Sequence, residues 1–452
     1  MSKRKRYVQV GVGGRSWVYT TALVKDMKAT CELVGICDTN RGRMELRNDK
    51  IVNELSGEAV PMFLDTEFDG MIQQVKPDVV IVTSVDSTHD HYIIRAMELG
   101  CDVVCEKPMT TDEHKCQNIV DTVNKTGRDL KVTFNCRYMP DMVQVKDLLM
   151  QGVIGNIRSL DVNWVLDVNH GASYYRRWHG EMEKSGGLLL HKATHHLDLV
   201  NWFLSANPVE VHAMGDRVFY GADSGMVERY GLQGHAERCL NCPVSKKCPF
   251  YLDISEDKGI KDLYLNCEKF DGYLRDRCVW HPKIDIQDTM NLTVRYDTGT
   301  FLSYSLNTFA PYEGFRYSFN GDKGRLEFES LGAPKDSQGK ELPAEGLPSG
   351  KSIRVYPHFG PARSIPVTEG KGGHGGGDVR LIDDLFGDTS PQDPFLRAAG
   401  YASGAMGILI GAAANKSMRT GLPVSIESLV KDLPPAKLPK MESGWECSKD
   451  PK

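Results

Sequence analysis

The sequence of 452 residues contains no apolar stretch of the roughly 18 to 20 residues that a membrane-spanning helix needs. It also lacks the pattern of a secretory signal peptide at its start, because the apolar residues after Lys5 alternate with glycine and are followed by Arg15. A net charge of −5 gives no general attraction to nucleic acid or anionic lipid. These absences predict a cytoplasmic protein that binds neither nucleic acid nor membranes.

A glycine-rich turn follows the first expected strand. Residues 7–14 have the pattern of a strand running into glycine, and a helix over residues 16–27 and a strand over residues 31–37 follow. In such a βαβ unit Gly11 permits the tight turn, and Gly13 lets the backbone approach a pyrophosphate. Ser16 stands where the usual fingerprint has a third glycine or alanine. The residues expected to contact a dinucleotide here are Gly11, Gly13, Gly14, Arg15 and Ser16.

Asp38 directly follows the second expected strand, 27 positions after Gly11. A carboxylate at this place accepts hydrogen bonds from ribose hydroxyls and repels a 2′-phosphate, which favours NAD over NADP. Arg41 and Arg43 weaken that preference, because either could pair with a phosphate. Asp38 could also cap the helix that begins near Arg41, and this role is compatible with cofactor binding.

Two more apolar strands are expected at residues 78–83 and 102–105, with helices over residues 87–99 and from about residue 111. Continuous apolar strands that alternate with amphipathic helices predict a doubly wound parallel sheet, a Rossmann-type α/β domain. Ligands of such sheets bind at the carboxyl ends of the strands. Residues 83–86 and Lys107 are expected at that edge.

Four motifs in consistent order resemble the Gfo/Idh/MocA family of NAD(P)-dependent sugar and polyol oxidoreductases. Glu106, Lys107 and Pro108 resemble the family's EKP motif. The other three motifs are the preceding loop with Ser84, Asp86 and His89, the opening of a second domain at residues 135–138 and 152–155, and a catalytic helix at residues 186–202. The resemblance covers residues 6 to about 330. It implies that Thr83, Ser84, His89, Glu106 and Lys107 face the cofactor.

The implied reaction is hydride transfer from a ring secondary hydroxyl of a sugar, sugar derivative or cyclitol. Removing the hydroxyl proton needs a base with a pKa near 7 and a cation that stabilises the developing alkoxide. Histidine meets the first need and lysine the second. By the resemblance, Lys107 orients and polarises the hydroxyl, and His195 is the catalytic acid/base.

The catalytic helix departs from the family pattern at one position. His191, His195, Asp198 and Trp202 are four, three and four residues apart, so a continuous helix would place them on one face. The family has an aspartate four residues before its catalytic histidine, whereas this chain has His191, a third candidate catalytic residue. Because a histidine supplies no negative charge, Asp198 could orient His195 or His196 instead. A catalytic metal on His191 and His195 is the alternative; no third ligand is evident in the sequence, although Asp198 could serve as one.

Further polar residues suit a carbohydrate. Residues 174–179, which include Trp178, offer rings for stacking and donors for hydroxyls, or else they form a surface loop with aromatic anchors. Arg137, Tyr138 and Lys192 are weaker candidates for substrate contact.

Residues 372–378 resemble a GHGG segment of the NAD-dependent N-acetylgalactosaminidase branch of the same superfamily. This resemblance makes His374 and Asp378 candidate substrate contacts. A flexible hinge with Asp378 as a helix N-cap is the alternative. The segment also raises a second function, a glycoside hydrolase that uses transient ring oxidation, elimination and re-reduction.

Beyond residue 131 the pattern changes to long alternating strands, expected at residues 157–168, 210–219, 286–296, 300–307 and 316–320. They predict an α+β domain with a large open, mainly antiparallel sheet. The resemblance implies that one face of this sheet roofs the active site and the other builds a homodimer or homotetramer. We expect a Rossmann domain at residues 1–130, a second domain at 131–432 and a tail at 433–452.

An insertion at about residues 221–282 carries five of the 12 cysteines. Cys239 and Cys242 form half of a zinc-site pattern, but the second half lacks the matching spacing. A structural zinc on Cys239, Cys242, Cys248 and Cys267 is one interpretation. Reduced cysteines without metal are the other main one, and an iron–sulfur cluster is less favoured than either.

Overall fold

The N-terminal domain is built on a parallel sheet in the order β15-β6-β5-β4-β1-β2-β3. The computed structural model describes residues 4–336, 339–387 and 393–441. β1 pairs in parallel with β2 on one side and β4 on the other, so the strand order reverses beside β1. This confirms the doubly wound Rossmann sheet. Its first six strands are β1 (Lys5–Val10), β2 (Cys31–Asp38), β3 (Met62–Leu64), β4 (Val79–Val82), β5 (Asp102–Cys105) and β6 (Leu130–Val132).

Helices cover both faces of this sheet, and its central strands are accordingly buried on both sides; all of β4, for example, is buried. The helix after β1 is α1 (Trp17–Thr21), which continues as a π-helical turn, η1 (Ala22–Asp26). The others are α2 (Arg41–Leu55), α3 (Phe68–Val75), α4 (His89–Glu98) and α5 (Glu113–Thr126), with short turns η2 (Asp65–Glu67) and η3 (Asp86–Thr88).

The second domain contains a nine-stranded sheet in the order β14-β13-β12-β11-β7-β10-β9-β8-β16. β10 and β7 are parallel, and the other pairs are antiparallel, as predicted. β12 to β14 and β16 extend the five predicted strands. The strands are β7 (Ile157–Asp167), β8 (Pro208–Asp216), β9 (Thr289–Tyr296), β10 (Phe301–Ala310), β11 (Tyr312–Gly321), β12 (Gly324–Pro334), β13 (Gly350–Pro357), β14 (Arg363–Ile365) and β16 (Val424–Ser425).

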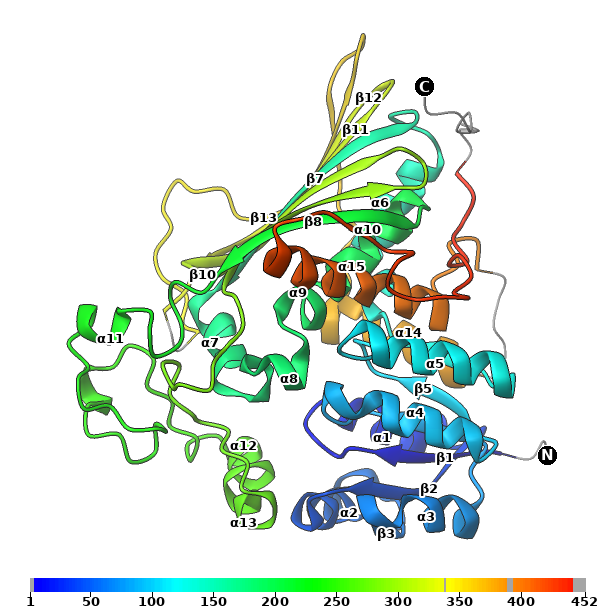
Figure 1. Ribbon diagram of the computed structural model, residues 1–452, viewed down its shortest axis with the longest axis vertical. Coiled ribbons are helices and arrows are strands. Elements are labelled where there is room, and N and C mark those ends of the chain that lie inside the picture. The colour runs from blue at the N-terminus through cyan, green and yellow to red at the C-terminus, as the bar shows by residue number, and fades with distance from the viewer. Residues whose placement is uncertain (1–3, 337–338, 388–392, 442–452) are drawn as a thin grey trace.

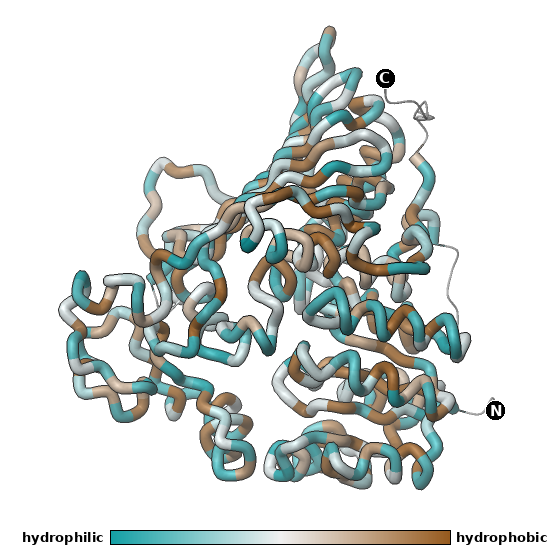
Figure 2. Tube along the Cα trace, in the orientation of Figure 1, coloured by the Kyte–Doolittle hydropathy of each residue, from teal (hydrophilic) through white to brown (hydrophobic). Residues whose placement is uncertain are grey.

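Burial alternates along these strands. In β9, Met290, Leu292 and Val294 are buried, whereas the residues between them are exposed. The buried face packs on α6, α10 and α15, which lie between the sheet and the Rossmann domain (Figure 1). Figure 2 shows that hydrophobic residues are concentrated in these helices beneath the sheet. These helices and their neighbours are η4 (Asn135–Tyr138), α6 (Pro140–Met150), α7 (Val168–Arg176), η5 (Trp178–Gly180), α8 (Met182–Ser185), α9 (Leu188–His191), α10 (Thr194–Leu204), η8 (Gly373–Gly376), α14 (Gly377–Phe386) and α15 (Tyr401–Thr420).

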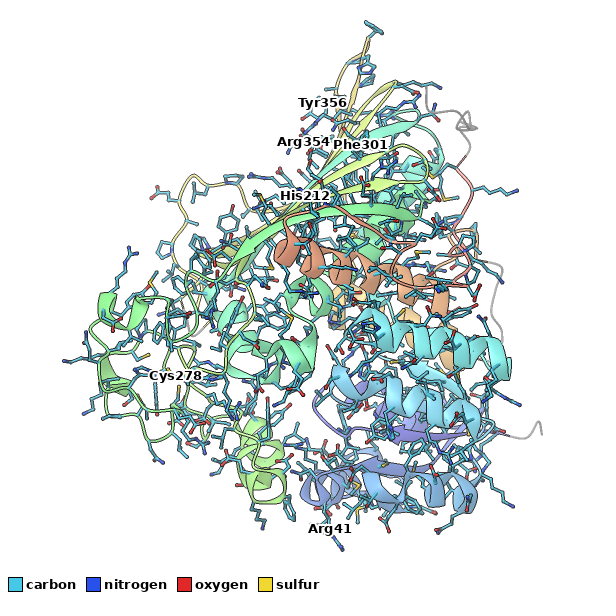
Figure 3. The ribbon with its side chains drawn as sticks, viewed as in Figure 1. Arg41, His212, Cys278, Phe301, Arg354 and Tyr356 are labelled. Carbon is cyan, nitrogen blue, oxygen red and sulfur yellow. The ribbon has the colours of Figure 1, made fainter. Side chains whose placement is uncertain are left out.

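The opposite face of the large sheet is open. It holds a hollow of about 480 Å³ whose lining includes His212, Met214 and Arg316. Figure 3 labels His212, Phe301, Arg354 and Tyr356 along this sheet, and Phe301 is 58% exposed. Within the described residues, none of the helices is long and apolar enough to cross a membrane.

The chain returns to the Rossmann domain after the second sheet. Phe386 of α14 packs edge-on against Tyr7, with ring centroids 5.2 Å apart. The short strand β15 (Ala399–Gly400) adds to the Rossmann sheet beside β6, and α15 then crosses to the large sheet. The chain therefore passes between the two domains again after the boundary expected near residue 131. Of the predicted tail, residues 442–452 lie outside the described residues, whereas Leu433, Leu438 and Met441 pack against the core.

The insertion forms a separate lobe at the side of the molecule (Figure 1). Cys278 lies in this lobe, away from the Rossmann sheet (Figure 3). Its short helices are α11 (Met226–Arg229), η6 (Ser245–Lys247), α12 (Lys258–Leu263), η7 (Leu265–Cys267) and α13 (Glu268–Asp271).

A buried ion pair links two elements of the second domain. Arg137 of η4 donates two hydrogen bonds, of 2.8 and 2.6 Å, to the carboxylate of Asp198 in α10. The two side chains are 0% and 1% exposed. Asp198 therefore orients Arg137 rather than His195 or His196. The Arg137 guanidinium is buried inside the domain in this ion pair. The prediction that Asp198 orients a histidine is wrong.

Replacing Asp198 by alanine should destabilise the protein strongly, because it leaves the Arg137 guanidinium buried and unpaired. The expected loss is about 3–5 kcal/mol of unfolding free energy. Glu45→Ala is the control, since it breaks the exposed pair of Glu45 with Arg41, and this should cost only about 0.3–0.5 kcal/mol. Denaturant unfolding of the two variants and the parent measures both changes. Equal losses would contradict a dominant role for the buried pair.

Candidate active site

The glycine-rich loop lies against the end of β4. Gly11 has a φ of 83°, and a Cβ there would come within 2.6 Å of the backbone of Thr83 and Ser84. The Thr83 hydroxyl donates to the carbonyl oxygens of Val10, at 2.9 Å, and Gly11, at 2.6 Å. A Cβ at Gly13 would meet nothing within 4 Å, so the loop is open at that point. This arrangement fits a pyrophosphate that approaches the backbone.

Two polar side chains hold the loop from within the protein. Ser16 donates to the Gly13 carbonyl at 2.6 Å. Arg47, only 4% exposed, donates to the Val12 and Gly13 carbonyls at 3.2 and 3.0 Å and to the Ser16 hydroxyl at 2.9 Å. Arg47 was not predicted, because it comes from α2, more than 30 residues away in sequence.

Asp38 ends β2 beside the loop. One of its carboxylate oxygens accepts the Val12 N–H at 2.7 Å, and the other accepts the Asn40 N–H at 2.8 Å. The N-cap of α2 is Asn40, whose side chain accepts the Arg43 N–H at 3.0 Å. The alternative role of Asp38 as the helix cap is therefore wrong. Burial raises the pKa of Asp38, and the two backbone N–H groups oppose that rise.

Arg15 joins the Rossmann domain to the glycine-rich segment before α14. Its guanidinium donates a hydrogen bond of 2.6 Å to Glu106 and two of 2.9 Å to the Asp378 carboxylate. Asp378 also contacts His374 at 2.9 Å and accepts from Asn135 at 2.8 Å. Burial alone would raise the pKa of Asp378, but the bonds from His374 and Arg15 hold it well below its ordinary value. The GHGGGD segment is thus fixed at the cofactor edge rather than forming a free hinge.

Lys107 follows β5 at the same edge. Its ammonium donates to the backbone carbonyl of His191 at 3.2 Å, so it reaches from the Rossmann domain to α9. Burial lowers the pKa of Lys107 to about 8, although the charge of Asp86 acts in the opposite direction. His89, 1% exposed, bonds to the carbonyls of Pro108 at 2.8 Å and Ser84 at 3.2 Å. It therefore positions the two loops around Lys107 from inside the domain.

The Asp86 carboxylate of the Rossmann domain contacts the end of α9. It bonds to Nδ1 of His191, and both residues are buried. Burial raises the pKa of Asp86 and lowers that of His191, and the nearby Lys107 charge lowers both. The family pattern has an aspartate one turn before His195; this chain has His191 there, and its partner Asp86 lies 105 residues away in sequence. The sequence showed Asp86 only as part of a loop motif.

His195 occupies a buried position beside these groups. Burial lowers its pKa well below the ordinary value, and the charges of Lys107 and Lys192 act in the same direction. The imidazole is therefore uncharged at neutral pH, and the same shift makes it a weaker base than an exposed histidine. Its Nδ1 lies 3.5 Å from the Cys136 sulfur, and its ring centroid is 6.2 Å from that of His374. Cys136 was not predicted as a neighbour of His195, because 59 residues separate the two in sequence.

The catalytic segment is not one helix. α9 ends at His191 and α10 begins at Thr194, so the prediction of a continuous helix is wrong. Trp202, placed on the same face in that prediction, donates to the Phe395 carbonyl at 2.6 Å. The break separates His191, which contacts Asp86, from His195, which contacts Cys136.

The remaining substrate candidates divide into two groups. Trp178 stacks on His179 with ring centroids 3.7 Å apart and meets the His191 ring edge-on at 5.7 Å. The buried Nδ1 of His179 has no hydrogen-bond partner among the described residues. Lys192 also lies in this group, because its charge lowers the pKa of His191 and of His195. Tyr138, in contrast, is 2% exposed and donates to Asp384 at 2.7 Å, so like Arg137 it is bonded inside the domain.

The predicted zinc ligands are not assembled. Cys267 lies against α2, where its carbonyl accepts from Asn40 at 3.0 Å. Cys239 accepts a hydrogen bond from Arg176 at 3.1 Å. Across the part of the chain that the structure describes, no group of three or more His, Cys, Asp or Glu side chains could hold a metal ion. This includes the alternative of a metal on His191, His195 and Asp198.

The sequence is similar to proteins of known family along nearly all of its length. The profile of the NAD-binding Rossmann fold of the GFO/IDH/MocA oxidoreductase family matches residues 5–134, and the profile of its C-terminal α/β domain matches residues 146–426. The YteT protein of Bacillus subtilis (strain 168), named as an oxidoreductase, is 36% identical over 433 residues, which span 94% of this chain and 98% of that protein.

Two further similarities are weaker. An inositol 2-dehydrogenase/D-chiro-inositol 3-dehydrogenase of Lactiplantibacillus plantarum is 24% identical over 200 residues, or 44% of this chain and 52% of that protein. The structure of the WlbA dehydrogenase from Bordetella pertussis, in complex with NADH and UDP-GlcNAcA, shares the fold with a TM-score of 0.61. It is 18% identical and covers 94% of this chain and 99% of that one. With these matches, the chain belongs to the Gfo/Idh/MocA family of oxidoreductases, enzymes with an NAD-binding Rossmann domain that act on CH–OH groups.

Proposed function

We propose that the protein is an NAD-dependent dehydrogenase that oxidises a ring secondary hydroxyl of a sugar, sugar derivative or cyclitol. The observation that carries the proposal is that Lys107 of the Rossmann domain lies close to His191 and His195 of the second domain. A buried ammonium and an uncharged imidazole are the two groups that the oxidation of an alcohol needs. The names of the inositol dehydrogenase relative and the WlbA structure support a carbohydrate substrate.

The cofactor residues are proposed from the open edge of the Rossmann sheet. Gly11, Gly13, Gly14 and Ser16 would receive the pyrophosphate, and Asp38 the ribose hydroxyls. A bound nicotinamide would supply the hydride acceptor. Arg15, Thr83, Ser84, His89 and Glu106 shape this edge, although the hydrogen bonds of His89 and Glu106 assign them to positioning the loops.

Each proposed catalytic side chain has one task. His195, uncharged at neutral pH, accepts the hydroxyl proton. The Lys107 ammonium donates a hydrogen bond to the same oxygen and stabilises its developing charge. The His191 carbonyl and Asp86 fix Lys107 between the domains. Trp178, His179 and Lys192 would contact the sugar ring and its other hydroxyls.

A second candidate function rests on the position of the GHGGGD segment. His374 lies beside His195 and is held there by Asp378, as a residue acting on a glycosidic substituent would be. In that case the chain would be a glycoside hydrolase that oxidises the ring transiently and then reduces it again. A dimer or tetramer and a cytoplasmic location stay predictions for either function.

Replacing Lys107 by methionine should lower kcat/KM by about 10²- to 10³-fold, the usual cost of losing one donor to a developing oxyanion. The affinity for NAD should change little, because the glycine-rich loop is held by Thr83, Ser16 and Arg47. Initial rates and NAD titration measure the two effects, and His212→Asn on the open sheet face is the control. Unchanged turnover in Lys107→Met would remove Lys107 from the mechanism.

The pH dependence should show an alkaline limb set by Lys107. Burial lowers the pKa of Lys107 to about 8, so its charge is present below that pH and lost as the pH rises through it. We therefore expect kcat/KM to fall above about pH 8. Lys107→Arg should move that limb to higher pH, because a guanidinium keeps its proton. A pH–rate profile with saturating NAD tests this, and an identical alkaline limb in both proteins would contradict the assignment.

The net reaction separates the two candidate functions. Incubation with a panel of sugars, cyclitols and chromogenic glycosides, followed for both NADH absorbance and released aglycone, should show one NADH per substrate oxidised. NAD should also exchange freely with the solvent. Aglycone release without net NADH, by protein that retains NAD through purification, would instead establish the glycoside hydrolase.

A further inference from the structure

The insertion packs on the Rossmann domain at the cofactor edge. In Figure 1, α12 and α13 lie beside α2, although more than 200 residues separate them in sequence. The Asn40 side chain donates to the Cys267 carbonyl at 3.0 Å. Phe270 packs so closely on α2 that a Cβ at Gly42 would lie 2.4 Å from its ring. The Tyr264 hydroxyl reaches the glycine-rich loop, 3.4 Å from a Cβ placed on Gly14.

Arg43 is held by this lobe on several sides. Its guanidinium pairs with Asp271 of α13 at 2.8 Å and donates to the Leu263 carbonyl at 3.3 Å. The rings of Tyr264 and Tyr273 each lie 5.7 Å from its central carbon. The Arg43 side chain is 12% exposed. Its buried Nη2 has no hydrogen-bond acceptor among the described residues, so the guanidinium keeps unused capacity to donate.

These residues are close to the proposed ribose site. Asp38 accepts the Asn40 N–H at 2.8 Å, and the Asn40 side chain accepts the Arg43 N–H at 3.0 Å. The charges of Arg43 and Asp271 both act on the Asp38 carboxylate, Arg43 lowering its pKa and Asp271 raising it. The insertion therefore brings a second carboxylate within electrostatic range of Asp38.

We propose that Asp271 is a specificity-determining residue that excludes NADP by neutralising Arg43 and holding it out of the ribose site. A free arginine at the start of α2 would pair with a 2′-phosphate, because its planar fork fits phosphate oxygens. Bound to Asp271 and enclosed by two tyrosines, Arg43 is withdrawn from that role. With Arg43 neutralised in this way, the Asp38 carboxylate is left without a free cation beside it and repels a dianionic 2′-phosphate. The proposal rests on the NAD preference proposed above and assigns part of it to the insertion.

The test measures the binding of NAD and NADP to the full-length protein by calorimetry, without any sugar substrate. Asp271→Asn should strengthen NADP binding by about tenfold or more, the usual gain from a hydrogen bond to a charged group. NAD binding should change by less than about threefold. Arg43→Ala added to Asp271→Asn should abolish the gain, because the gain needs the released guanidinium.

Glu268→Gln is the matched control, since Glu268 lies on the same short helix and pairs with Arg238 at 2.6 Å, away from Arg43. It removes one carboxylate without freeing Arg43, so the ratio of the two affinities should stay at the parent value. An unchanged ratio in Asp271→Asn, or equal losses for both cofactors, would overturn the role of Asp271. A parent protein that prefers NADP would overturn the proposed NAD preference itself, which is a separate outcome.

Discussion

The contact between Asp86 and His191 joins the two domains at the point where the chemistry is proposed. Asp86 follows β4 in the Rossmann domain, and His191 ends α9 in the second domain. Lys107 lies beside both, bonded to the His191 carbonyl at 3.2 Å. Without this junction the carboxyl edge of the parallel sheet would be a nucleotide-binding surface alone. With it, a lysine from one domain faces histidines from the other.

Burial explains why these residue types suit the site. In water His195 would be partly protonated near neutral pH, but burial and the charges of Lys107 and Lys192 keep it neutral. The same burial brings the pKa of Lys107 from its ordinary value near 10.5 to about 8. Burial in one environment therefore lowers the pKa of both the proton acceptor His195 and the cation Lys107, and the charge of Lys107 also acts on His195.

Local sequence patterns were sufficient for the features that depend on neighbouring residues. Apolar runs and the Gly11 turn predicted the Rossmann sheet, and alternation predicted β7 to β11, because strand burial is set by the side-chain period. The same patterns failed where partners come from distant segments. Asp198 pairs with Arg137, and Cys267 packs on α2 rather than joining Cys239. Such pairings depend on how the chain folds back, which spacing does not encode.

The break between α9 and α10 shows a different limit. The helical period runs through residues 185–202 without interruption, so the sequence predicts one helix. In the structure the helix is interrupted at Lys192 and Ala193. The carbonyl of His191, just before the break, accepts a hydrogen bond from the Lys107 ammonium. A carbonyl at the end of a helix is free of the bond that a continuous helix would give it. The break therefore leaves the His191 carbonyl available as the acceptor that Lys107 uses.

The insertion and the returning C-terminal segment enclose the Rossmann edge from two sides. Asp378 of α14 pairs with Arg15, which also bonds to Glu106, while Asp271 of α13 pairs with Arg43. Each arginine starts from the cofactor edge, and each is fixed by a carboxylate from outside the first 130 residues. The orientation of both arginines therefore depends on carboxylates outside the Rossmann domain.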